Sequence, residues 1–321
     1  MKSTYRLSFL ASCICLAVGS SQAYAACDNT SPGNGTTVTC DANSIETTPV
    51  VSPNGVDGVI VDVLQGGALN VTTGPAISLG NGSKVTNNGS ISGTSSGLLL
   101  REGSSLVINN GAISAASGPG LIFDGTGNNS LTNSGTITGR DAKGNAVIFG
   151  SGMDTLIVNA GSVIDGNVDQ DFGSTGTSGS GDDTFIMNGG AIHGTVDQGG
   201  GPGIDKAEIH DGKIDGDFKQ GGGRDTFVMT GGTIVGEFND GDIVTITGGS
   251  IGSVALNLGN DDFKMSGGEI VGDVKGQVNN DSFVISDKAV VGGDILGGIG
   301  NDSLVWQDGG TIKGKILMDG D

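Results

Sequence analysis

Aromatic and basic side chains are scarce in this chain. Its 321 residues include one Trp, two Tyr and 15 Lys or Arg, against 35 Asp or Glu, so the formal net charge is −20. A strongly negative chain repels nucleic acid and anionic lipid, and we expect it to bind neither. The sequence also contains no Gly-Asp-Ser-Gly-type protease motif, phosphate-binding loop, basic patch or amphipathic helix. These absences argue against several enzyme classes and against nucleic acid-binding proteins.

Long apolar runs are lacking beyond the N-terminus. The single run, Leu7 to Val18, follows Lys2 and Arg6 and precedes Ala23-Tyr24-Ala25. A basic start, an apolar stretch and a small-x-small site together form the pattern of a secretory signal peptide. We therefore predict a signal peptide over residues 1–25 and export of the mature chain. No later run approaches the roughly 18 residues of a membrane helix, so we expect no transmembrane helix.

Glycine, in contrast, is abundant, with 63 residues. It belongs to a repeat of about twenty residues in which a short polar turn precedes an apolar residue, as in Asn109-Asn110-Gly111-Ala112-Ile113. The apolar residues that mark the repeat are Leu69, Ile91, Ile113, Ile137, Val163, Ile192, Ile214, Ile234, Ile251, Ile270, Val290 and Ile312. The segments between turns are short, β-branched and alternating, which indicates strands. We predict one right-handed parallel β-helix of about twelve coils over residues 59–321, an all-β fold without a central pocket.

The strands of the second half alternate between two faces. In Phe227-Val228-Met229 and Phe263-Lys264-Met265, Phe and Met share one face and the middle residue takes the other. Because Lys264 is charged, we assign the Phe and Met face to the core. The expected aromatic column contains Phe185, Phe227, Phe263 and Phe283, with Trp306 in the same register.

A polar residue lies four positions before most of the marker residues. It is asparagine in five consecutive repeats: Asn87, Asn109, Asn133, Asn159 and Asn188. Asparagine tolerates left-handed backbone angles, and its amide can hydrogen-bond to the same amide one coil away. We predict a structural polar ladder of these five residues.

Only two cysteines remain after the signal peptide, Cys27 and Cys40. An exported protein meets an oxidising compartment, so we predict a structural disulfide between them. Two cysteines without a nearby histidine cannot supply the four ligands of a structural zinc site. The bridge precedes the repeats, where a first coil would expose strand edges and apolar core. We therefore predict that residues 26–58 form an N-terminal capping segment.

The signal peptide, the segment from Cys27 to Cys40 and the glycine-rich coils together resemble the passenger region of autotransporters, the type V secreted proteins of Gram-negative bacteria. The resemblance implies passage through the periplasm to the outer membrane and display of a β-helical stalk at the cell surface or outside the cell. It also implies an adhesin-type role in virulence or biofilms, with host or neighbouring-cell surface molecules, or further copies of the chain, as partners.

Members of that family end in an outer-membrane β-barrel. This sequence ends at Met318-Asp319-Gly320-Asp321, in the phase of a further coil that matches Gly300-Asn301-Asp302. We therefore expect a truncated or split product, whose barrel lies elsewhere or is missing, or is joined in cis if a full-length protein exists.

A Gly-x-Gly-x-Asp turn opens several coils and ends at Asp154, Asp183, Asp205, Asp225 and Asp302. It resembles the calcium-binding turn of repeats-in-toxin β-rolls, which recurs about every nine residues, whereas here it occurs once per coil. We favour a structural role, in which Gly supplies positive φ and Asp caps a bend. Calcium bound by these five aspartates is the alternative, because stacked carboxylates repel one another and a cation would relieve the repulsion.

Catalysis has little support, and we predict that the protein is not an enzyme and has no catalytic residue. His193 and His210 lie in adjacent coils at different points of the turn. The alternative is a carbohydrate-active β-helical enzyme similar to polysaccharide lyases. That enzyme would need acidic residues and one of Arg101, Arg140 or Arg224 in a single lateral groove.

The strip from Gly166 to Gly181 interrupts the rhythm of the repeat. We predict that Asp171 to Ser180, within this strip, leaves the helix as a loop, because that part is rich in Gly, Ser and Thr.

Overall fold

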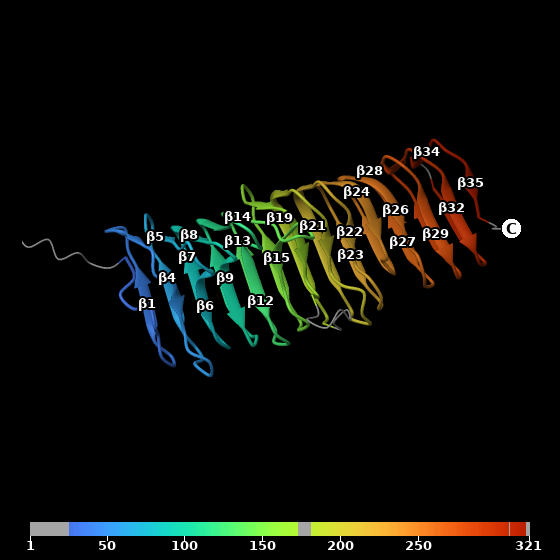
Figure 1. The fold of residues 1–321 in the computed structure, drawn as a ribbon. Helices are drawn as coiled ribbons and strands as arrows, with labels where there is room; N and C mark the ends of the chain where they lie inside the picture. Colours follow the sequence, from blue (N-terminus) through green and yellow to red (C-terminus); the bar gives the residue numbers. More distant parts are fainter. Residues whose placement is uncertain (1–25, 173–180, 308, 319–321) are drawn as a thin grey trace, which may run out of the picture.

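The chain winds into a rod of stacked coils with its two ends at opposite tips (Figure 1). The computed structural model describes residues 26–172, 181–307 and 309–318. The strands that stack from coil to coil pair in parallel, which gives a β-solenoid of about twelve turns, as predicted. Within the described ranges there is no helix, and hence none long and apolar enough to cross a membrane. The predicted signal peptide lies outside the described residues.

Three ladders of strands run along the rod, because most coils have three straight segments separated by turns. The first ladder consists of β1 (Thr37–Cys40), β4 (Ile60–Val63), β7 (Lys84–Asn87), β10 (Leu106–Asn109), β13 (Ser130–Asn133), β16 (Thr155–Val158), β19 (Thr184–Ile192), β21 (Lys206–Ile214), β23 (Thr226–Met229), β25 (Ile243–Ile246), β27 (Asp262–Met265), β30 (Ser282–Ile285) and β33 (Ser303–Trp306).

The second ladder shares the C-terminal ends of β19 and β21 with the first. Its other strands are β2 (Ile45–Glu46), β5 (Ala68–Asn70), β8 (Ser90–Gly93), β11 (Ala112–Ala115), β14 (Thr136–Thr138), β17 (Val163–Asp165), β24 (Thr233–Asn239), β26 (Ser250–Ala255), β28 (Glu269–Ile270), β31 (Val290–Val291) and β34 (Thr311–Ile312).

The third ladder shares the C-terminal ends of β24 and β26 with the second. Its other strands are β3 (Val50–Val51), β6 (Pro75–Leu79), β9 (Ser96–Arg101), β12 (Leu121–Asp124), β15 (Asn145–Ile148), β18 (Asn167–Asp169), β20 (Val196–Asp197), β22 (Phe218–Lys219), β29 (Val274–Val278), β32 (Ile295–Ile299) and β35 (Ile316–Leu317).

The core is a set of apolar columns, one side chain per coil. On the first ladder the central column is Val38, Val61, Val85, Val107, Leu131, Leu156, Phe185, Ala207, Phe227, Val244, Phe263 and Phe283. Each of these side chains is fully buried, and each buried aliphatic or aromatic side chain contributes about 1.5–3 kcal/mol. The predicted inward face of the Phe strands is therefore confirmed, and Lys264 points outward.

Trp306 does not share the register of Phe227, contrary to the prediction. Trp306 is the register partner of Ile285, and Leu304 is the register partner of Phe283, which continues the column of Phe227. Trp306 is 52% exposed, and its Nε1 donates to the carbonyl oxygen of Gly310 at 2.9 Å. The two positions differ by two residues, so both lie on the same side of the strand and the sequence pattern alone does not separate them.

The predicted marker column is correct in ten coils and wrong in two. Ile164 and Val291, not Val163 and Val290, are paired with the neighbouring markers and fully buried. The turn before Ile164 and before Val291 is longer than in the early coils. Ile164 lies six residues after Val158, whereas Ile137 lies four residues after Asn133, the partner of Val158. A shift of one residue turns a strand residue to the opposite face, so Val163 and Val290 lie on the outer side.

The predicted asparagine ladder holds for three of its five members. Asn87, Asn109 and Asn133 stack in register and are fully buried. Asn87 Nδ2 donates to Asn109 Oδ1 at 2.8 Å, and Asn109 Nδ2 donates to Asn133 Oδ1 at 2.7 Å. The same amide groups bind the backbone of the tight turn, for example by accepting from Gly89 N and donating to Ala112 O.

Asn159 and Asn188 do not belong to this inner ladder. The positions in register with Asn133 are Val158 and then Met187, both buried, because the longer turn displaces each asparagine by one residue. Asn159 and Asn188 instead lie outside, where Asn188 Nδ2 donates to Asn159 Oδ1 at 3.2 Å.

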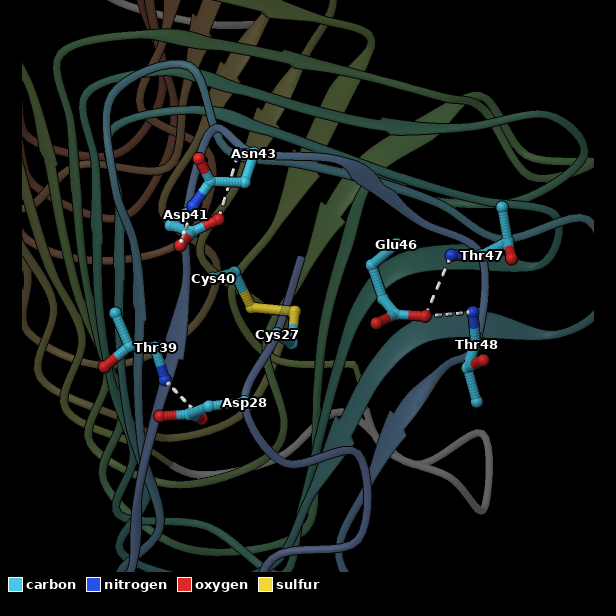
Figure 2. The surroundings of a disulfide bond; sticks show 9 residues. All are labelled: Cys27, Asp28, Thr39, Cys40, Asp41, Asn43, Glu46, Thr47 and Thr48. Atoms are coloured by element: carbon cyan, nitrogen blue, oxygen red, sulfur yellow. Dashed lines mark hydrogen bonds between the residues drawn. A yellow bond between two sulfur atoms is a disulfide. The ribbon is translucent and has the colours of Figure 1, made fainter. Parts of the chain in front are cut away.

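The N-terminal tip carries the Cys27–Cys40 disulfide, and both cysteines are buried (Figure 2). Asp28 Oδ1 accepts a hydrogen bond from Thr39 N at 2.9 Å and fixes the segment against β1. Glu46 ends the second-ladder marker column, in register with Leu69, and its Oε1 accepts from the backbone of Thr47 and Thr48. A polar residue thus closes the apolar column at this tip.

Stacked coils start earlier than the sequence boundary at residue 59. Strands β1, β2 and β3, within the predicted capping segment 26–58, already pair with β4, β5 and β6. The strip that interrupts the repeat begins with a regular strand, because Asn167–Asp169 forms β18 and pairs with β15 and β20. Residues 173–180 of that predicted loop lie outside the described residues.

Candidate functional site

A hollow on the described surface follows the third ladder. Two adjoining cavities, of about 310 and 500 Å³, share Asp197 and Lys219, and together we call them the lateral groove. Its lining residues are Lys143, Asn145, Asn167, Val168, Asp169, Thr195, Asp197, Gly199, Gly200, Asp217, Lys219, Gly221, Asn239, Asp240 and Asn257. They come from the coils of β15, β18, β20, β22, β24 and β26, so the groove runs along the rod.

Glycine shapes the floor of the lateral groove. Strands β20 and β22 have two residues each, and Gly199, Gly200 and Gly221 follow them. A Cβ on Gly221 would lie 1.7 Å from the carbonyl oxygen of Gly199, so the two coils stack backbone on backbone there. The lack of side chains at these points leaves the hollow open.

Polar side chains of both charges line the groove. Asp169, Asp197 and Lys219 are successive partners in the outward register of the third ladder. Burial, followed by the charge of Asp197, raises the pKa of Asp169 to about 6. Burial also raises the pKa of Asp240 to about 6, with the nearby carboxylate of Asp242 as the second cause. The groove is therefore acidic at neutral pH, with four carboxylates against two lysines.

Several groove residues also hold adjacent coils together. Asn167 Oδ1 accepts from Thr195 N at 3.0 Å, and Asp217 Oδ1 accepts from Glu237 N at 2.9 Å. At one end, Lys143 Nζ lies 4.7 Å from the ring centre of Phe172. The hollow thus presents amide, carboxylate and ammonium groups at intervals of about 4.8 Å, the spacing of the stacked strands.

The arginines required by the enzyme alternative lie outside this lining. Arg101 donates to the backbone oxygen of Ser52 at 2.6 Å, and Arg140 pairs with Asp165. Arg224 is likewise not a lining residue. His193 and His210 are separate as well: His193 Nδ1 lies 2.7 Å from Asp215, and His210 Nδ1 lies 3.2 Å from Thr230. The groove therefore collects acidic residues without the arginine of the lyase-like arrangement.

None of the five calcium candidates is a lining residue of the groove; they lie in one interior line. Asp183 Oδ1 accepts from Asp154 N, Asp205 Oδ1 from Asp183 N, and Asp225 Oδ1 from Asp205 N, each at 2.7 Å. Asp302 Oδ1 accepts from Asp281 N at 2.9 Å in the same manner. We name this line the aspartate column; its members are Asp154, Asp183, Asp205, Asp225, Asp242, Asp261, Asp281 and Asp302.

The aspartate column explains the Gly-x-Asp spacing. A Cβ on Gly181, Gly203 or Gly223 would lie 2.0 Å or less from a carbonyl oxygen of the coil below, and 3.0–3.5 Å from Oδ1 of the following aspartate. Glycine at this point lets the coils approach closely enough for the carboxylate to reach the backbone N–H. Among the described residues, no group of three or more His, Cys, Asp or Glu is placed to hold a metal ion. The structural role of the aspartates stays the favoured prediction, and calcium binding stays the alternative.

Sequence reasoning missed a second interior ladder. Gln170, Gln198 and Gln220 are buried on consecutive coils, and Gln220 Nε2 donates to Gln198 Oε1 at 3.3 Å. Each amide also donates to the carbonyl oxygen of a residue that begins a first-ladder strand: Thr184, Lys206 or Thr226. The sequence does contain a pattern that indicates this ladder: an apolar residue, a charged residue and glutamine recur as Val-Asp-Gln at 168–170 and 196–198 and as Phe-Lys-Gln at 218–220.

Comparison with known proteins supplies no relative: no protein family, no curated protein and no solved structure matches this chain.

Proposed function

We propose that this protein is an exported, adhesin-type stalk of the autotransporter passenger class, which acts as a surface structure and not as an enzyme. The observation that carries the proposal is the solenoid itself. Its three parallel ladders continue through about twelve turns around a core of stacked apolar columns. Such a rod separates its tips by many coils and offers long lateral faces to partners. The signal-like N-terminus and the buried Cys27–Cys40 disulfide support an extracytoplasmic site.

Export is tested by producing the full chain in a Gram-negative host and fractionating the cells. The expected product begins at Ala26, is found in the periplasm or the medium, and has Cys27 and Cys40 oxidised when analysed by mass spectrometry. A chain that keeps Met1 and its free thiols in the cytoplasm contradicts the proposal.

Partner binding on the rod is assigned to the lateral groove. Its acids, amides and lysines repeat at the coil spacing, which suits an extended polar polymer or the same face of a second copy. The test couples the mature protein to latex beads and counts both bead clusters and attachment to bacterial cells. The paired change Asp197→Ala with Lys219→Ala should reduce attachment or clustering.

The matched control is Asp262→Ala with Lys264→Ala, which removes one acid and one lysine from the outer side of the first ladder. Equal adhesion by both paired variants would show that the groove is not the contact face. Beads that neither cluster nor attach would remove the adhesin role and leave an exported stalk.

A further inference from the structure

Six of the eight aspartates in the column have a buried carboxylate oxygen without a partner. The Oδ2 atoms of Asp154, Asp183, Asp225, Asp261, Asp281 and Asp302 are buried without a hydrogen bond. The side chains of Asp154, Asp183 and Asp225 are at most 1% exposed. An ionised carboxylate in such a place loses its hydration without compensation, which strongly disfavours the charged form.

Asn129 shows which chemical group satisfies this position. It lies one coil before Asp154 in the same line, where its Oδ1 accepts from Ser105 N at 3.0 Å and Asp154 Oδ1 accepts from Asn129 N at 2.6 Å. Its Nδ2 donates to the carbonyl oxygen of Gly127, two residues earlier, at 2.7 Å. A protonated aspartate has the shape of asparagine, with an O–H donor in place of the N–H donor.

We propose that the aspartate column is a series of proton-binding sites in which Asp154, Asp183, Asp205, Asp225 and Asp261 are held as neutral carboxylic acids. In Asp154, Asp183, Asp205 and Asp225, Oδ1 keeps the backbone N–H of the neighbouring coil, whereas neither oxygen of Asp261 has a hydrogen bond. In each of the five, the proton on Oδ2 is donated to the carbonyl oxygen two residues earlier, as in Asn129. In all five cases that earlier residue is a glycine: Gly152, Gly181, Gly203, Gly223 and Gly259.

The charged groups around the column favour proton uptake. The carboxylates that act on it from outside its own line are Asp171, Asp182 and Asp240, and within the line each aspartate faces the next. Among the described residues of the column with a shifted pKa, one is influenced by a cation: the positive charge of Arg224 lowers the pKa of Asp261. Negative neighbours raise the pKa of a carboxyl group because they disfavour a second negative charge.

The direction of the pH effect follows from burial. It raises the pKa of Asp154, Asp205 and Asp261 to about 8, of Asp183 to about 9 and of Asp225 to about 7, against about 3.9 in an unfolded chain. At pH values between the unfolded pKa and the folded pKa of these groups, the folded rod binds more protons than the unfolded chain. The stabilisation is therefore complete below about pH 4 and is lost as the pH rises to about 9.

The test is the melting temperature of the mature chain across this pH range. For the wild type it should fall by roughly 10 °C between pH 5 and pH 9, since several coupled sites lose a proton. Asp183→Asn should melt above the wild type at pH 9, with a shallower pH dependence. Asp183→Ala, which leaves the N–H of Asp154 unpaired, should melt lower at every pH.

The matched control is Asp62→Asn, which removes the same charge from the outer side of β4 and should leave the pH dependence unchanged. Infrared spectra supply a second measurement: at pH 7 the wild type should show the band of protonated carboxylic acid, and the variant with all five aspartates changed to Asn should lose most of it. A pH dependence of Asp183→Asn equal to that of the wild type, or no such band, overturns the proposal.

Calcium is tested against the proton in the same experiment. At pH 9, melting of the wild type is compared with calcium chloride and with a chelator. Equal melting temperatures support proton binding. A calcium-induced return to the melting temperature of pH 5 would show that a cation, and not a proton, neutralises the column.

Discussion

At the scale of single residues, the stability of the rod depends on polar side chains that satisfy the turns from inside. Asn87, Asn109 and Asn133 occupy the tight turns between the first and second ladders, where an apolar side chain would leave backbone groups unpaired. The wider turns that follow Val158 at the end of β16 and Met187 within β19 have these apolar side chains at the same point. Turn length and side-chain polarity therefore change together.

Asn109→Ala tests the inner ladder. The change removes the acceptor of Asn87 and the donor to Asn133, both buried, and we expect a loss of about 1–3 kcal/mol in the free energy of unfolding. Urea unfolding measures it. The control Asn110→Ala removes the exposed bond from Asn110 to Asn88 and should cost less than about 0.5 kcal/mol. Equal losses would contradict an energetic role for burial in this ladder.

Gly203→Ala tests the close approach at the aspartate column. The new Cβ would lie 2.0 Å from the carbonyl oxygen of Gly181, so the two coils must separate. We expect destabilisation of about 1–3 kcal/mol or more, because backbone cannot yield as a side chain does. Gly33→Ala is the control, since its nearest atom is a methyl carbon of Thr36 at 4.0 Å. Circular dichroism melting of both variants measures the difference, and a tolerated Gly203→Ala would show that the coils can part freely.

At the scale of strands and coils, the register decides which residue is core. Ile164 is fully buried between Ile137 and Ile192, whereas Val163 is on the outer side of β17. Two adjacent aliphatic residues thus have opposite roles, and substitution can separate them.

Ile164→Ala should cost about 2–5 kcal/mol, as large-to-small core changes do, because the stacked coils cannot collapse into the space. Val163→Ala should cost less than about 1 kcal/mol, because little buried contact is lost. Chemical denaturation of the two variants measures both values. The reverse order would show that the sequence-based register, with Val163 inside, is correct.

At the scale of the whole molecule, coils contact mainly their neighbours, so damage should stay local. The Cys27–Cys40 disulfide closes a short loop at one tip, and chain-entropy models assign such a bridge about 3 kcal/mol. Loss of that bridge should loosen the first coils and leave the distant ones folded.

Hydrogen exchange of the double variant Cys27→Ala and Cys40→Ala measures this locality. We expect faster exchange over residues 37–63 and unchanged exchange over 226–285. The matched comparison is the wild type after its disulfide has been reduced, which should give the same exchange pattern as the double variant. Uniformly faster exchange along the rod would mean that the coils unfold as one cooperative unit.

Much of this architecture was accessible from the sequence alone, because a repeat with a short period dictates it. The recurrence of polar turn and apolar residue determined the parallel solenoid, and alternation in Phe263-Lys264-Met265 determined which face is core. The pairing of Cys27 with Cys40 followed from their number and place. These features depend on local patterns that each coil repeats.

Only the tertiary structure decided the rest, because it depends on how turns of unequal length stack. Asn159 lies outside and Val158 inside because the coil gains residues between strands, which the alternation within one strand does not reveal. The glutamine ladder, the lateral groove and the carboxylate bonds of the aspartate column all join residues about twenty positions apart. Such contacts exist only when neighbouring coils meet in one particular register, and that register is a property of the stack.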